Sequence, residues 1–130
     1  VIRRLRLDEL AEEVVRFAHH PDTEVRSSAL KALAALEPRP SEVGREAILR
    51  EMESEHPHLR AHACRAAPWL PRESAVPALW ERLADRSWWV RLAAAETLGA
   101  MAPYQLAEAV ERHPDAFARD VASVVSGVGP

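Results

Sequence analysis

Two histidines, His58 and His62, stand four residues apart and are the side chains whose spacing most plainly suits chemistry. Residues at this spacing lie on one face of a helix, and two imidazoles placed in this way can share a metal ion. No third ligand is fixed by the same motif, and Glu51 or Glu55 would contribute only through the fold. The pattern therefore favours a surface histidine pair over a metal centre.

Other catalytic signatures are missing from the sequence. Cys64 is the one cysteine, which excludes an intrachain disulfide and a multi-cysteine zinc site, and its alanine-rich helical context predicts a buried thiol. The four glycines are isolated, so no glycine-rich phosphate loop is present, and no local motif joins serine, histidine and aspartate into a triad. We expect no catalytic residues and no cofactor.

Composition narrows the class of partner. A chain of 130 residues with 48% hydrophobic and 28% charged residues fits one folded domain or one short repeat array. The net charge of −3 argues against a surface built to bind nucleic acid. No apolar run could span a membrane, and no signal peptide is evident, so we expect a cytoplasmic protein.

The two ends of the sequence predict a fragment of a longer protein. The chain starts at Val1 without methionine and stops abruptly after residues 128–130. Residues 1–6 could be the tail of a preceding helix or the basic flank of a removed transmembrane segment. The first of these alternatives is favoured.

Four arginines mark an internal repeat, with spacings of 34, 31 and 28 residues. An apolar residue precedes each arginine, an alanine follows three residues later, and a possible N-cap stands four residues before it. These positions share one helical face, so each arginine belongs to the second helix of a pair. The arginines are Arg26, Arg60, Arg91 and Arg119; the possible N-caps are Asp22, His56, Ser87 and Asp115.

Apolar stripes between these segments predict the first helix of each pair. We expect Pro77 to lie in the first turn of one of them, where its missing amide hydrogen costs little. No strand or hairpin pattern competes. The eight predicted helices cover residues 7–18, 23–36, 41–53, 57–69, 74–84, 88–101, 104–112 and 116–126, and the repeats cover about 7–36, 41–70, 74–101 and 104–126.

The segments FAHHPDTEVRSSALKALAAL and ERLADRSWWVRLAAAETLGAM resemble HEAT repeats, in the short form also seen in phycobilin-lyase-like proteins. This resemblance implies an all-α fold, a right-handed α-solenoid of about four antiparallel helix pairs. It implies that the second helices line the concave side and that the repeated arginines form interhelical hydrogen bonds near the loops. Asp85 is the one aspartate six residues before such an arginine, so a regular Asp–Arg ladder is not expected.

A binding surface is expected on the opposite face of the second helices, away from the core stripe. If the second helices stack in register, this surface is polar near the N-terminus and becomes apolar toward the C-terminus. Trp89 and Phe117 would be neighbours there, as aromatic anchors of an interface. The predicted partner-binding residues are Trp89, Phe117, His58, His62, Lys31, Arg65, Glu96 and Trp69. The final helix reads as apolar on both faces, which indicates a missing covering segment, self-association or a partner surface.

These patterns predict a non-catalytic protein-binding or scaffold module. One alternative is an accessory or regulatory subunit of an enzyme, including a lyase-like chaperone for a cofactor. A further alternative is a nucleic-acid-binding domain, which Trp88 and Trp89 suggest and the acidic charge balance opposes.

Overall fold

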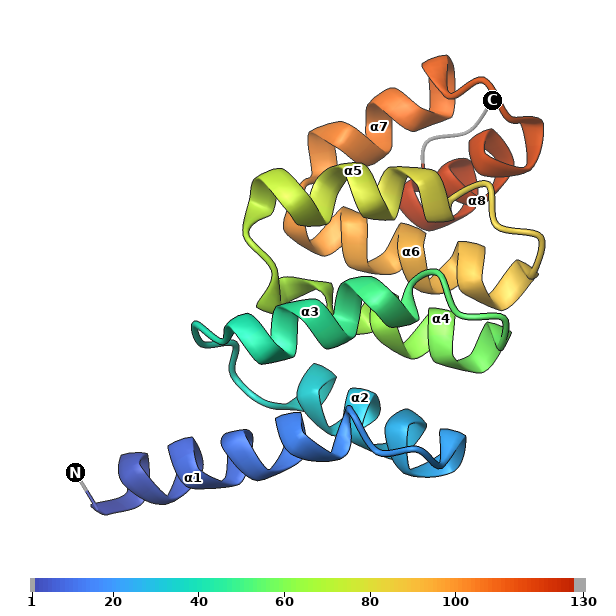
Figure 1. Ribbon diagram of the computed structural model, residues 1–130. Helices are drawn as coiled ribbons and strands as arrows, with labels where there is room; N and C mark the ends of the chain where they lie inside the picture. The colour runs from blue at the N-terminus through green and yellow to red at the C-terminus, as the bar shows by residue number, and fades with distance from the viewer. Residues whose placement is uncertain (1, 128–130) are drawn as a thin grey trace.

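The computed structural model describes the backbone of residues 2–127 and the side chains of residues 6–127. The described chain is all-helical and contains no strand, as the sequence predicted (Figure 1). Its eight α-helices are α1 (Ile2–Phe17), α2 (Thr23–Ala35), α3 (Glu42–Glu51), α4 (Pro57–Arg65), α5 (Arg72–Arg82), α6 (Trp88–Met101), α7 (Pro103–Arg112) and α8 (Ala116–Ser126), and a 3₁₀ turn, η1 (Ala67–Trp69), follows α4.

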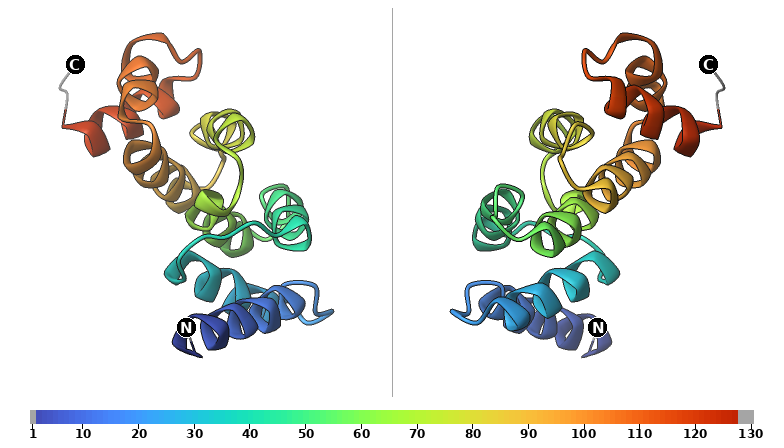
Figure 2. Two further views of the ribbon diagram at one scale, coloured as in Figure 1. Left: turned by 90° about the vertical axis from the view of Figure 1, so that its left-hand side faces the viewer. Right: turned by 90° about the vertical axis from the view of Figure 1, so that its right-hand side faces the viewer.

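The helices pack as four consecutive pairs in two layers. Each odd-numbered helix contacts the even-numbered helix that follows it, and the second helices α2, α4, α6 and α8 contact one another in succession. The first helices contact one another sparsely and fan out on the other side (Figure 2). Because the second helices are the closely packed layer, they form the inner, concave side of the stack.

Small residues permit this close packing. The alanine three positions after each repeated arginine is buried in all four repeats: Ala29, Ala63, Ala94 and Ala122. A methyl group at these positions lets two helix backbones approach more closely than a larger side chain would. The alanine pattern read from the sequence is thus part of the core.

Several helix ends differ from the predicted ones by one or more residues, and two of the differences involve proline. Residues 2–6 are helical and continuous with α1, which was predicted to begin only at residue 7. α4 ends at Arg65 and not at residue 69, because Pro68 cannot continue a helix and the chain forms the 3₁₀ turn instead. α5 begins at Arg72, which places Pro77 inside the helix and not in its first turn.

Candidate functional site

The four repeated arginines share one structural contact. In every repeat, Nη1 of the arginine donates a hydrogen bond to the backbone carbonyl six residues earlier, in the loop between the two helices of the pair. The bonds are Arg26 to His20 (3.1 Å), Arg60 to Ser54 (2.8 Å), Arg91 to Asp85 (2.7 Å) and Arg119 to His113 (2.7 Å). The predicted hydrogen-bonding role of these arginines near the loops is therefore confirmed.

The residue that offers this carbonyl has a second shared role. Its side chain accepts a hydrogen bond from the backbone amide two residues later, which fixes the loop just before the second helix begins. The acceptors are His20 Nδ1 (3.0 Å), Ser54 Oγ (3.1 Å), Asp85 Oδ1 (2.9 Å) and His113 Nδ1 (3.1 Å). Histidine, serine and aspartate can all accept here, so the position repeats in function although its residue type varies.

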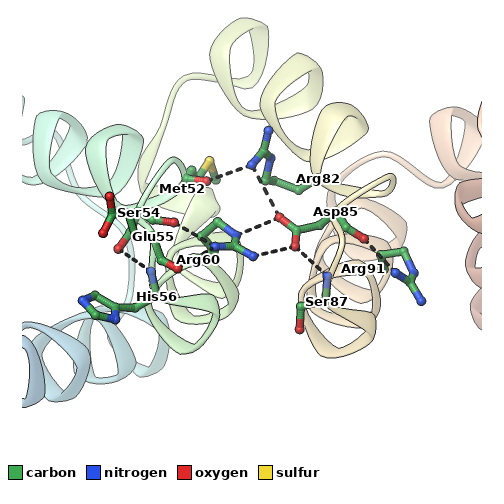
Figure 3. A network of polar contacts seen from close by, with 9 residues as sticks. All are labelled: Met52, Ser54, Glu55, His56, Arg60, Arg82, Asp85, Ser87 and Arg91. Carbon is green, nitrogen blue, oxygen red and sulfur yellow. Dashed lines mark hydrogen bonds and ion pairs between the residues drawn. The ribbon is translucent and has the colours of Figure 1, made fainter.

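Arg60 and Asp85 join the second repeat to the third (Figure 3). Nε and Nη2 of Arg60 lie 2.8 and 2.9 Å from the two carboxylate oxygens, and both side chains are buried. Burial alone would raise the pKa of Asp85, but the hydrogen bonds from Arg60 and from the Ser87 amide, with the charge of Arg82, outweigh it. The pKa of Asp85 therefore lies below its ordinary value.

The other joints use different chemistry. Arg26 Nε pairs with Glu51 Oε2 at 2.9 Å between the first and second repeats. Between the third and fourth, the guanidinium of Arg91 lies 5.0 Å from the centre of the Phe117 ring. Regular Asp–Arg pairing is therefore absent from the described joints, as expected.

On the outer layer, a nitrogen donor from one repeat caps the end of the preceding first helix. Arg50 donates to the carbonyl of Ala18 (2.9 Å), Arg82 to that of Met52 (3.2 Å) and the ring N–H of His113 to that of Trp80 (3.1 Å). The final carbonyls of a helix lack intrahelical hydrogen-bond partners, and these bonds supply a donor to one of them in each helix. These three side chains thus tie each first helix to the repeat that follows it.

The polar part of the predicted surface lies on the inner layer in the expected register. Arg65 Nη2 and Glu96 Oε1, which occupy the same position in successive repeats, are 3.1 Å apart. Lys31 is exposed one repeat earlier. Burial lowers the pKa of His62, and the charges of Lys31, His58 and Arg65 lower it further. A cationic group of side chains therefore surrounds this histidine.

The apolar part of the surface is a group of aromatic rings at the starts of α6 and α8. Trp89 is 46% and Phe117 64% exposed, and Phe117 lies against Arg91, two residues beyond Trp89. Trp88 is exposed as well and meets Trp89 edge-on, with ring centroids 5.3 Å apart. Trp88 was not among the predicted partner-binding residues, although its place next to Trp89 at a helix start was a usable signal.

Trp69 is not on this surface, and its predicted placement is wrong. It is only 3% exposed, and its indole N–H donates to the carbonyl of Leu33 at 2.7 Å. The prediction assumed that α4 continues to residue 69. Because the helix ends four residues earlier, the indole turns into the core between the first two repeats.

Two further predictions concern metal and thiol chemistry. Across residues 6–127 no group of three or more histidine, cysteine or acidic side chains could hold a metal ion. Nε2 of His58 is buried without a hydrogen-bond partner among these residues. Cys64 is fully buried, as predicted, and burial raises the pKa of its thiol to about 12.

Comparison with known proteins identifies the repeat. A family model described as HEAT repeats matches residues 45–125, which is more than half of the chain. No curated protein matches. No helix in the described part of the chain is both long enough and apolar enough to cross a membrane.

Proposed function

Because the chain belongs to the HEAT repeat family, we propose that it is a non-catalytic protein-binding module whose partner lies along the inner face of the second helices. HEAT repeats commonly mediate contacts between proteins. The aromatic group of Trp88, Trp89 and Phe117 carries the proposal to this chain. Large rings are costly to leave in water, and clustered exposed aromatics are typical interface anchors.

The side chains on this face suggest which kinds of residue the partner would present to it. Trp89 and Phe117 would receive an apolar or aromatic segment of the partner. About one to two repeats away, the same face carries the positive charges of Lys31 and of Arg65, the latter in an ion pair with Glu96. A partner segment with an apolar anchor followed by acidic residues would match both ends.

The repeated arginines support this choice of face indirectly. Their guanidinium groups are engaged with loop carbonyls or with the next repeat, so they hold the stack together and are not available as ligand contacts. Arg91 makes both kinds of contact: it donates a hydrogen bond to a loop carbonyl, and it lies over the Phe117 ring of the next repeat.

Site-specific photocrosslinking in the cells that make the protein tests this proposal. A photoreactive phenylalanine analogue replaces Trp89 in one variant and Tyr104 in a control, because Tyr104 is 89% exposed but lies on α7 in the outer layer. We expect a discrete protein adduct from position 89 and none of the same mass from position 104. An adduct from position 104 with none from position 89 would contradict the assignment.

A stability control separates binding from packing. Replacing Trp89 or Phe117 with alanine should change the melting temperature by less than about 3 °C, because exposed side chains contribute little to the core. A loss of about 10 °C would identify them as packing residues and would remove the basis of the proposal.

A further inference from the structure

The middle of the inner face holds a group of nitrogen-bearing side chains from two neighbouring helices. His62 and Arg65 lie on α4, and Lys31 lies on α2, which packs directly against α4. Lys31 and Arg65 occupy the same position in successive repeats, and both are exposed. His62 comes three residues before Arg65, so the two side chains belong to the same side of α4.

Most of these nitrogens have no partner within the described residues. Lys31 and the His62 ring make no ion pair or hydrogen bond there. Arg65 uses Nη2 for Glu96, at 3.1 Å, which leaves its Nε and Nη1 without a partner in the same part of the chain. The Arg65 and Glu96 side chains are 44% and 48% exposed, so their ion pair is weak, and the guanidinium can bind a second carboxylate.

The charges that act on His62 are positive. Partial burial lowers the pKa of His62, and the charges of Lys31 on α2 and of His58 and Arg65 on its own helix lower it further. His62 is therefore uncharged at neutral pH.

The other helices packed against α4 do not reverse this balance. On α6, Glu96 shares the row of Arg65 and contacts it. On α2, Glu24 lies at the helix start, in the row of His58 and not in that of His62. The turn η1 carries no titratable side chain, and α3 belongs to the outer layer, where its buried Glu51 contacts arginines.

A carboxylate placed among Lys31, His62 and Arg65 would change the protonation of the histidine. It would accept hydrogen bonds from the lysine and the arginine and offset their charges. It would also favour the protonated imidazole, because a nearby opposite charge raises the pKa of a histidine. Binding of the carboxylate and binding of a proton at His62 would then strengthen each other to the same extent.

We infer that Lys31, His62 and Arg65 receive a carboxylate side chain of the partner, and that His62 takes up a proton when this carboxylate binds. The inference rests on the proposed function, since it assigns the acidic part of the partner segment to the repeats that precede Trp89. It makes recognition on the inner face dependent on pH, with tighter binding on the acidic side of neutrality.

The dissociation constant of the partner crosslinked at position 89, measured by calorimetry at about pH 7.5 and about pH 6, tests this inference. Aspartate and glutamate side chains stay ionised over this range, so the histidine is the group that changes. We expect the dissociation constant to fall about five-fold at the lower pH. His62→Gln should remove this pH dependence. His56→Gln is the matched control, because His56 is exposed in the loop before α4, and it should keep the dependence.

The imidazole resonances of His62 in NMR spectra give a second reading, which needs no partner. In the free chain, Lys31→Gln should raise the pKa of His62, because it removes one of the charges that lower it. Arg112→Gln removes a positive charge from α7 in the outer layer and should leave that pKa unchanged. Melting curves show whether each variant is folded.

The outcomes separate this inference from the proposed function. A dissociation constant that is the same at both pH values, or a pH dependence that survives His62→Gln, would overturn the inference and leave the proposed function in place. So would a pKa of His62 that does not respond to Lys31→Gln. Failure of position 89 to crosslink any protein would overturn both.

Discussion

Asp85 is the residue on which one joint of the stack depends most. It accepts two hydrogen bonds from Arg60 and one from the Ser87 amide, and its own carbonyl accepts from Arg91. Arg60 and Asp85 are almost fully buried. Removing one partner of such a pair leaves an uncompensated buried charge, which typically costs about 3–5 kcal/mol.

Asp85→Asn is therefore expected to lower the free energy of unfolding by about 3 kcal/mol, measured by urea denaturation at pH 7. The variant also has a predicted pH signature. Because the pKa of Asp85 is lowered in the folded state, its ionised form stabilises the fold above the ordinary aspartate pKa. That contribution disappears as the pH falls through the folded-state pKa.

The unfolding free energy of the parent chain should hence fall more steeply below about pH 4 than that of Asp85→Asn. Asp120→Asn provides the control, because Asp120 is exposed and its loss should leave the acid profile unchanged. Parallel acid profiles for the parent chain and Asp85→Asn would refute the role given to this carboxylate.

The arginine contacts show how far residue-level prediction reached. Their spacing identified the repeat, and the resemblance to HEAT repeats implied that they form hydrogen bonds near the loops. Their inter-repeat partners were not predictable. Glu51, Asp85 and the Phe117 ring occupy different sequence positions, and only packing brings them to the arginine of the preceding repeat.

At the scale of the helices, the periodic patterns predicted which helices exist more accurately than they predicted where each helix begins and ends. The bounds of α6 and α8 agree with the prediction, because a polar residue stands at each start and the pattern runs unbroken. The bounds of α4 and α5 do not, because the prediction ignored Pro68 as a breaker and took residue 74 as a start. Misplacing the end of α4 also misplaced Trp69.

Pro77 gives the element-scale prediction. It lies inside α5, exposed, and lacks the amide hydrogen that would bond to the carbonyl of Glu73. Pro77→Ala should raise the free energy of unfolding by about 2 kcal/mol, since the restored hydrogen bond outweighs the added freedom of the unfolded chain. Chemical denaturation measures the change.

Pro103→Ala is the matched substitution. Pro103 is also exposed but begins α7, where proline removes no intrahelical hydrogen bond, so its replacement should not stabilise the protein. If both substitutions had the same effect, the position of Pro77 within α5 would not explain its cost.

At the scale of the whole molecule, the four-pair stack and the register of its rows followed from the repeat alone. The degree to which each apolar residue is buried did not follow from the repeat. Whether an apolar residue is buried by a neighbouring repeat depends on which repeats are present, and Val25 looks like Leu59 or Val90 in the sequence. The structure shows the difference: Val25 is partly buried, whereas Leu59 and Val90 are completely buried.

The inner face is the second whole-molecule property, because it arises from four helices that are separate in sequence. Lys31, Arg65 and Glu96 form one row only when α2, α4 and α6 are stacked, and the Arg65–Glu96 contact shows this register. As an exposed ion pair it adds little stability, so its value to the protein lies in the surface it helps to form.

The dissociation constant of the partner crosslinked at position 89 tests the central claim most directly. It should be measured by calorimetry for the parent chain and for Trp89→Ala, Phe117→Ala and Tyr104→Ala. Loss of an interface anchor costs about 2 kcal/mol or more, so Trp89→Ala should weaken binding about thirty-fold or more. Phe117→Ala should weaken it clearly and Tyr104→Ala by less than about two-fold. An unchanged dissociation constant for Trp89→Ala, or an equal loss for Tyr104→Ala, would contradict binding through the inner face.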